Sequence, residues 1–336
     1  MHLLLSLLSL FTLSHQHQSQ QLGIGFDFAP AYATSAISHP NGSNIALARV
    51  NGDDAWRALM TRICFDPNSH LGKPGSTATS ASTTMVDMIR ALVKASEDRL
   101  GHRILAATVS MPSREDGSRG GRPISDLVRE SFSVVGLEYL PSVFSSFFGE
   151  PLLYPENSIM AAHDLGLCHP YNVSKNHCLG PPGRAERSKE TYYLVGYYSD
   201  ALEVIETSPT ALAYEITPYP YTDHQLGESM RDRNPDEAFY WEQVRRILSM
   251  PLLKNIWKPT KVIVYGDRSN DTHLRQVIAE VLRAFLGEDE QPQWVSDNID
   301  PVFAGAMGAA VFAKRQPFWK WEQSMSDVAP TYKIDL

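Results

Sequence analysis

The stretch GFDFAPAYATSAI, from Gly25 to Ile37, places one aspartate in a predicted strand–turn–strand hairpin. A carboxylate such as that of Asp27 is a suitable ligand for a divalent cation beside a phosphate. A loop that holds phosphate, however, needs backbone N–H groups that a ligand can approach closely. Here the turn consists of Ala29, Pro30 and Ala31. The hairpin therefore combines an acid suited to phosphate chemistry with a turn that is not.

Two further polar positions could take part in the same chemistry. Glu156 precedes a small-residue helix predicted from about Asn157 to Leu165. It is either a catalytic acid or base or a charge that favours the helix N-terminus. The run Gly266–Arg268 follows a predicted buried strand, and its glycine either makes a tight turn or admits a ligand. The sequence leaves these alternatives open.

The composition is that of a folded, acidic protein. The 336 residues are 43% hydrophobic, with a formal net charge of −8 and a pI near 5.8. A chain of this length can form two lobes of ordinary domain size. We expect no nucleic-acid partner, because such proteins carry basic surfaces. We also expect no membrane span, because no apolar run reaches the roughly 20 residues required.

Residues 1–21 are typical of a secretory signal peptide. Leu3 to Leu13 form an apolar segment of suitable length, followed by a polar stretch. A short buried strand or helix is the alternative interpretation. We therefore expect a secreted or extracellular protein. The endoplasmic reticulum is the alternative location, because the C-terminal residues 333–336, KIDL, resemble a retention tetrapeptide.

The cysteines and the glycosylation sequons fit an oxidising compartment. Cys168 and Cys178 bracket a short loop that can close as a disulfide, which leaves Cys64 as a buried thiol. Nearby histidines permit a zinc site instead, although the spacing matches no standard one. These histidines are His163, His169 and His177. N-glycosylation sequons begin at Asn41, Asn172 and Asn270.

The two halves of the chain share one predicted order of elements: three strands, a helix, a strand and two helices. This repetition predicts two similar α/β lobes that meet at a central cleft. The predicted boundaries are 1–21 for the signal peptide, 22–180 for lobe I, 181–190 for a linker, 191–315 for lobe II and 316–336 for a C-terminal tail. Residues 72–84 are predicted as a loop from their composition, and residues 211–217 as the third strand of lobe II.

Six segments in this order resemble the nucleotide-binding domain of the seventy-kilodalton heat-shock chaperones, within the actin-like ATPase superfamily. They are GFDFAPAYATSAI, ILAATVSMP, PENSIMAAHDLG, YYLVGYYSDALEV, VIVYGDRSNDTHLRQVIAEVL and DNIDPVFAGAMGAAVFAKR. The resemblance implies an α/β, two-lobed actin-like ATPase fold, a duplicated ribonuclease-H-like architecture with a central cleft. The family's substrate-binding domain has no counterpart in this sequence.

The resemblance also implies an ATP and magnesium site. Asp27 matches the family's magnesium aspartate, and Asp27 and Glu156 are the implied catalytic acids. The implied nucleotide contacts are Gly25, Asp27, Gly196, Ser199, Gly266, Asp267 and Arg268. The family's Gly-Thr-Thr turn is replaced here by alanine, proline and alanine. In the second hairpin, a tyrosine and an aspartate flank Ser199 where the family has glycines.

These replacements predict that phosphate binding is weakened or lost. Hydrogen bonds to charged groups contribute roughly 1.5–3 kcal/mol each, so the loss of two or three weakens binding on the order of a thousandfold. We expect a secretory-pathway pseudo-ATPase that acts as a binding scaffold for an unknown protein partner. The alternative is an active, divergent ATP-binding protein or ATPase that uses Asp27 and Glu156 with magnesium.

Overall fold

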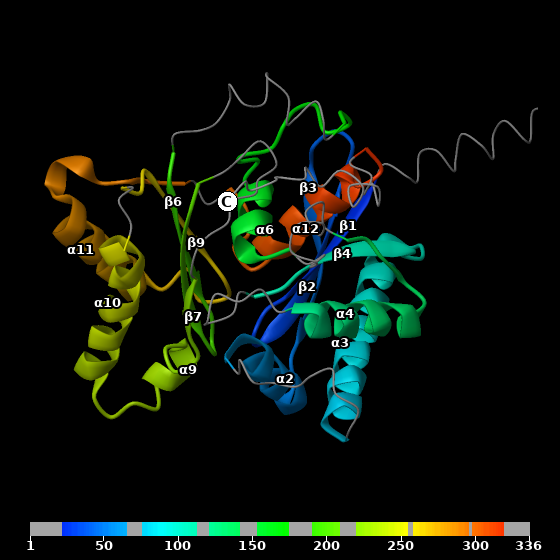
Figure 1. The fold of residues 1–336 in the computed structure, drawn as a ribbon, viewed down its shortest axis with the longest axis horizontal. Helices are drawn as coiled ribbons and strands as arrows, with labels where there is room; N and C mark the ends of the chain where they lie inside the picture. The colour runs from blue at the N-terminus through cyan, green and yellow to red at the C-terminus, as the bar shows by residue number, and fades with distance from the viewer. Residues whose placement is uncertain are drawn as a thin grey trace, which may run out of the picture.

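The structure, a computed structural model, is built from two α/β lobes. It describes residues 22–65, 76–112, 121–141, 153–174, 190–208, 220–254, 258–295 and 298–318. Each lobe contains a five-stranded mixed sheet. The sheets stand on either side of a pair of central helices, and further helices cover their outer faces (Figure 1).

The two sheets have the same strand order and the same strand directions. The lobe I sheet consists of β3 (Asn44–Asn51), β2 (Tyr32–Ser38), β1 (Gly23–Phe28), β4 (Ala106–Ser110) and β5 (Glu138–Tyr139). The lobe II sheet consists of β8 (Tyr221–Asp223), β7 (Leu202–Thr207), β6 (Tyr192–Tyr197), β9 (Lys261–Tyr265) and β10 (Gln293–Trp294). In each lobe the first three strands in the chain are antiparallel, and the last two run parallel to the first. This duplication confirms the two-lobed actin-like ATPase fold.

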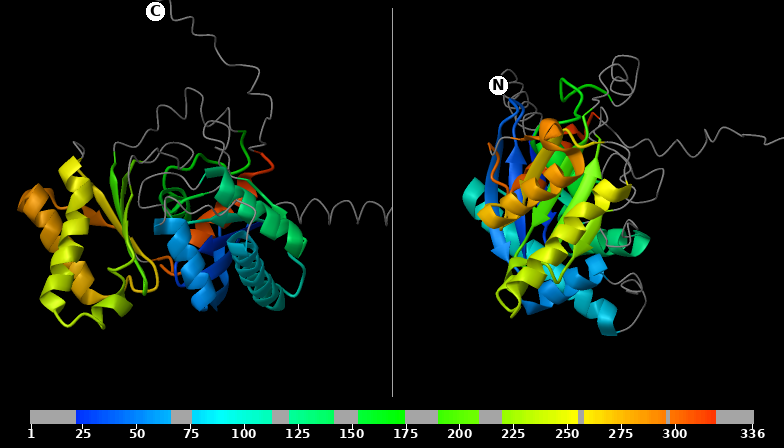
Figure 2. Two further views of the ribbon diagram at one scale, coloured as in Figure 1. Left: turned by 60° about the horizontal axis from the view of Figure 1, so that its bottom comes forward. Right: turned by 90° about the vertical axis from the view of Figure 1, so that its left-hand side faces the viewer.

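The helices fall into three groups: those of lobe I, those of lobe II and a central pair between the two sheets (Figure 2). Lobe I carries α2 (Asp54–Phe65), α3 (Ser76–Leu100) and α4 (Gly121–Val135). Lobe II carries α9 (Glu228–Arg231), α10 (Glu237–Lys254), α11 (Thr272–Leu286) and the 3-10 turn η1 (Glu288–Glu290). The central pair is α6 (Pro155–Ala162) and α12 (Ala304–Arg315). No helix among the described residues is long and apolar enough to cross a bilayer.

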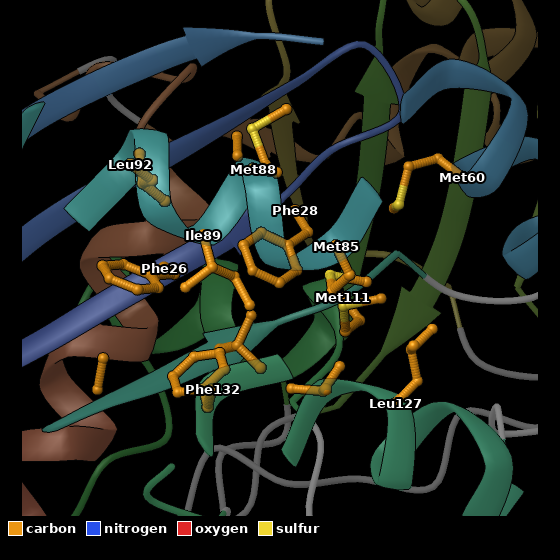
Figure 3. Close-up of a cluster of buried hydrophobic side chains, with 14 of the residues drawn as sticks. Phe26, Phe28, Met60, Met85, Met88, Ile89, Leu92, Met111, Leu127 and Phe132 are labelled. Atoms are coloured by element: carbon orange, nitrogen blue, oxygen red, sulfur yellow. The ribbon is translucent and has the colours of Figure 1, made fainter. Parts of the chain in front are cut away.

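Strand β1 separates two layers because its residues alternate between faces. Ile24, Phe26 and Phe28 are buried in the lobe I core. There they share a cluster with side chains from α3 and α4, including Ile89 and Phe132 (Figure 3). The opposite face of β1 is turned toward α12, and Asp27 lies on that face.

Close packing of glycines fixes α12 against lobe I, although this helix follows lobe II in the chain. A Cβ on Gly25 would lie 2.1 Å from the Ala310 backbone nitrogen. A Cβ on Gly308 would lie 1.7 Å from the Ser158 carbonyl oxygen of α6. Only glycine permits backbones to approach so closely. The N-terminal turn of α12 is thereby held beside Asp27.

Two predictions of local structure were wrong. Residues 76–84, predicted as a loop, form the start of α3. One face of this segment is buried at Ala81 and leads to the buried Met85, and such tertiary packing stabilises a helix more than composition does. The third strand of lobe II in the sheet is β8, in a segment predicted as a loop. The predicted strand 211–217 lies outside the described residues.

Candidate functional site between the lobes

The turn of the first hairpin is bound by its own lobe. Ala29 and Ala31 are buried. The Trp56 indole N–H donates to the Ala29 carbonyl over 3.2 Å, and the Gly52 N–H donates to the Ala31 carbonyl over 2.8 Å. Pro30 between them has no N–H. The carbonyl groups on either side of Pro30 are therefore bound within lobe I, and Pro30 supplies no N–H to a phosphate.

Asp27 lies at the first turn of α12, partly buried. A Cβ on Gly305 would lie 2.3–2.5 Å from the carboxyl atoms of Asp27, so this carboxyl group packs directly on the glycine. Desolvation raises the pKa of Asp27 to about 7, against a smaller lowering by a hydrogen bond with Ser110. Near neutral pH the side chain therefore exists in both protonation states.

The second hairpin holds a carboxylate of the protein itself. The Ser199 backbone N–H donates to Asp267 Oδ1 over 3.0 Å, and the Ser199 hydroxyl donates to Asp267 Oδ2 over 2.7 Å. The Arg268 Nε donates to the same hydroxyl over 3.2 Å. Only 6% of the Asp267 side chain is exposed. An internal anion thus occupies the donors that the resemblance assigns to phosphate.

Three buried tyrosines connect the two hairpins with strand β9. The ring centroids of Tyr32 and Tyr198 are 6.4 Å apart, and those of Tyr198 and Tyr265 are 6.1 Å apart. Gly196 leaves room for this cluster, because a Cβ there would lie 2.8 Å from the Tyr265 ring. Desolvation raises the pKa of Tyr198 well above its usual value, so the ring stays neutral. The space between the hairpins is therefore packed with aromatic side chains.

Charged pairs join the two lobes at this site. Arg57 of α2 contacts Asp200 of the second hairpin at 2.7 Å. Arg49 of β3 lies 3.4 Å from Asp267, and its guanidinium is 4.3 Å from the Tyr32 ring centroid. In both pairs the arginine belongs to lobe I and the aspartate to lobe II. These pairs favour the closed arrangement of the hairpins.

Glu156 and Gly266 border the tyrosine cluster. Glu156 is buried in the first turn of α6, and its charge contributes to the raised pKa of Tyr265. Gly266 has a φ of +96°, and a Cβ there would lie 2.4 Å from the Tyr197 carbonyl oxygen. Its conformation and crowding explain why glycine stands at this strand exit. Within the described residues, no group of three or more His, Cys, Asp or Glu side chains could hold a metal ion.

The structure brings some of the predicted site residues into contact with one another. Ser199, Asp267 and Arg268 form one hydrogen-bonded group, whereas Gly25 packs on α12 instead of facing a ligand. Sequence reasoning missed the tyrosine cluster and both bridging arginines. The sequence signal was a tyrosine at three positions: directly after the first hairpin turn (Tyr32), directly after β6 (Tyr198) and at the end of β9 (Tyr265).

The residues expected to mark a secreted protein are only partly described. Cys168 and Cys64 are buried. Cys178 lies outside the described residues, as do the signal segment 1–21 and the tail beyond residue 318, so the disulfide and the signal peptide stay predictions. The three sequon asparagines, Asn41, Asn172 and Asn270, are exposed.

Comparisons with known proteins leave the family open. No family model matches the chain, and no curated protein matches it. Among solved structures, the chain is similar to the ethanolamine utilization protein EutJ from Carboxydothermus hydrogenoformans, with a TM-score of 0.44 and 14% identity. The match covers 87% of this chain and 90% of that one. So distant a likeness carries no inference about function, and the fold assignment rests on the duplicated strand order.

Proposed function

We propose that this protein is a pseudo-ATPase: an actin-like ATPase fold kept as a binding scaffold, without turnover of ATP. The main observation behind the proposal is that the backbone N–H and the hydroxyl of Ser199 both donate hydrogen bonds to the Asp267 carboxylate. Residues that would hold a nucleoside triphosphate in the family that this sequence resembles are here hydrogen-bonded to one another. The residues present therefore do not fit a bound nucleotide.

The free energy of this internal contact supports the proposal. A phosphate that binds Ser199 must first displace two hydrogen bonds to a carboxylate, worth roughly 1.5–3 kcal/mol each. This displacement alone weakens binding on the order of a hundredfold to ten-thousandfold. The ligand must also move Tyr198, whose ring is buried between two other tyrosines. The absence of a donor at Pro30 adds to the loss.

Kinship with the heat-shock chaperones and passage through the secretory pathway belong to the same proposal. Both rest on the sequence: the six resembling segments, the segment 1–21 and the exposed sequon asparagines. Expression of a tagged copy in eukaryotic cells tests the location. We expect the protein in the medium, with a mass that falls after glycosidase treatment. A full-length, unglycosylated protein in the cytosol would contradict the secretory assignment.

Calorimetric titration with ATP and Mg²⁺, paired with a phosphate-release assay, tests the lack of nucleotide chemistry. We expect no saturable heat up to about 1 mM ATP and no phosphate release above the buffer background. The Asp27→Asn variant is the control for the alternative mechanism. Micromolar affinity, with hydrolysis that this substitution abolishes, would replace the pseudo-ATPase by an active enzyme that uses Asp27.

A further inference from the structure

A second concave site lies at the other end of α12. It is a pocket of about 560 Å³ between the β2–β3 turn, the segment after α6 and the last turn of α12. Pockets that bind small molecules typically span about 300–1,000 Å³. From Gly305 beside Asp27 to Lys314 in this pocket, nine helical steps of 1.5 Å give a separation of about 14 Å. The pocket is therefore separate from the hairpin site and independent of the proposed function.

The pocket contains two buried cations in succession, Lys314 and Arg315. Lys314 Nζ donates to the His39 carbonyl over 2.8 Å and lies 4.9 Å from the Tyr171 ring centroid. Arg315 donates through Nη1 to the Cys168 carbonyl over 2.7 Å. Lys314 therefore contacts a neutral carbonyl oxygen and an aromatic ring.

Lys314 has little negative charge close to it. Among the described residues, no carboxylate lies within ion-pair distance of Lys314. Asp164 also lines the pocket and acts on both cations beyond ion-pair distance of Lys314. Its side chain is 63% exposed and lies 3.0 Å from His169 Nε2. Desolvation is the main cause that lowers the pKa of Lys314 to about 8. Burial of a cation is costly unless an anion compensates it.

The lining suggests what the compensating anion looks like. Ala161, Ala162, Val295, Ile299 and Val311 give the pocket apolar walls, beside the ring of Tyr171. Asn44 also lines it, and its buried Oδ1 accepts no hydrogen bond within the described part of the chain. An uncoordinated acceptor of this kind can receive a donor from a ligand.

We propose that this pocket binds a small organic anion, with a carboxylate or phosphate group on Lys314 and Arg315 and an apolar body along the Tyr171 wall. The guanidinium fork suits both anionic groups, and the lysine adds a point charge. Cations that merely cap the C-terminus of a helix are usually exposed and weakly stabilising. Here the two cations are buried in a cavity large enough for a ligand.

Calorimetry on the full chain near neutral pH tests this proposal with 4-phenylbutyrate, phenyl phosphate and the uncharged 4-phenylbutyramide. We expect at least one anion to bind with a Kd of about 1 mM or lower, and the amide about tenfold more weakly. Whichever of the two anions binds more tightly identifies the headgroup. Lys314→Met keeps the apolar stem and removes the charge, and should weaken binding about tenfold. Lys94→Met, at an exposed lysine of α3, is the matched control and should bind like the wild type.

Three results would overturn the proposal: no binding of either anion at about 20 mM, equal binding of the amide, or unchanged binding by Lys314→Met. If Lys314→Met does not fold, Lys314→Arg takes its place. Lys314→Arg keeps the positive charge and should still bind the anion. If Lys314→Arg folds but binds neither anion, the proposed role of the charge is wrong.

Discussion

Asp27→Asn should stabilise the protein at neutral to alkaline pH. The pKa of Asp27 is raised from 3.8 to about 7 by desolvation. The native state therefore binds more protons than the unfolded state between these two values, so stability falls as the pH rises through this window. Asparagine resembles the protonated acid and carries no charge to desolvate.

The size of the effect follows from linkage. Each pKa unit corresponds to about 1.4 kcal/mol, so ionised Asp27 destabilises the native state by up to about 4 kcal/mol above the folded pKa. The free energy of unfolding of Asp27→Asn, minus that of the wild type, should therefore rise by about 3 kcal/mol between about pH 4.5 and pH 8. The comparison across pH cancels any constant difference between the two side chains.

Urea unfolding of both proteins across this pH range, in the presence of a chelator, measures the effect. Asp289→Asn is the control, because Asp289 is exposed on η1. The difference in free energy of unfolding between this variant and the wild type should not change with pH. If the free energy of unfolding of Asp27→Asn relative to the wild type also stays constant across this pH range, within about 0.5 kcal/mol, the desolvation argument is wrong. A variant less stable than the wild type at about pH 8 would show that the ionised carboxylate has a favourable partner.

Three further experiments test the packing and charges of the site. Asp267→Ala should destabilise by about 3 kcal/mol in urea unfolding, because it leaves buried donors unpaired, whereas Asp232→Ala, at an exposed position, should change little. A double-mutant cycle on Arg57 and Asp200 should give a coupling below about 1 kcal/mol that declines with salt, because the pair is partly exposed. A coupling of several kcal/mol would contradict this view. Gly308→Ala should lower the melting temperature strongly, because its Cβ would overlap α6; an unchanged melting temperature would mean that the helices pack less closely.

The fold could be predicted from the sequence because its signals are local and repeated. Alternation in β1 separates the core residues Phe26 and Phe28 from Asp27, and the same order of strands and helices occurs in both halves. The loop prediction for residues 76–84 failed because burial on the α3 face outweighs a loop-like composition.

The site could be predicted only in part. The sequence indicated which phosphate-binding residues are replaced, but not what takes their place. The contact between Ser199 and Asp267 joins positions 68 residues apart in the chain, and Arg57 reaches Asp200 across 143 residues. No local pattern encodes such pairs. The first contact depends on the pairing of β6 with β9 within lobe II, and the second on how the two lobes close on each other.

The most direct test of the central claim is the backbone amide resonance of Ser199 in a ¹H–¹⁵N spectrum. If this N–H donates to Asp267, its resonance should move strongly in Asp267→Asn and should not move when Mg²⁺ and ATP are added to the wild-type protein. A saturable shift of the Ser199 amide with ATP, together with little change in Asp267→Asn, would mean that the hairpin binds phosphate after all.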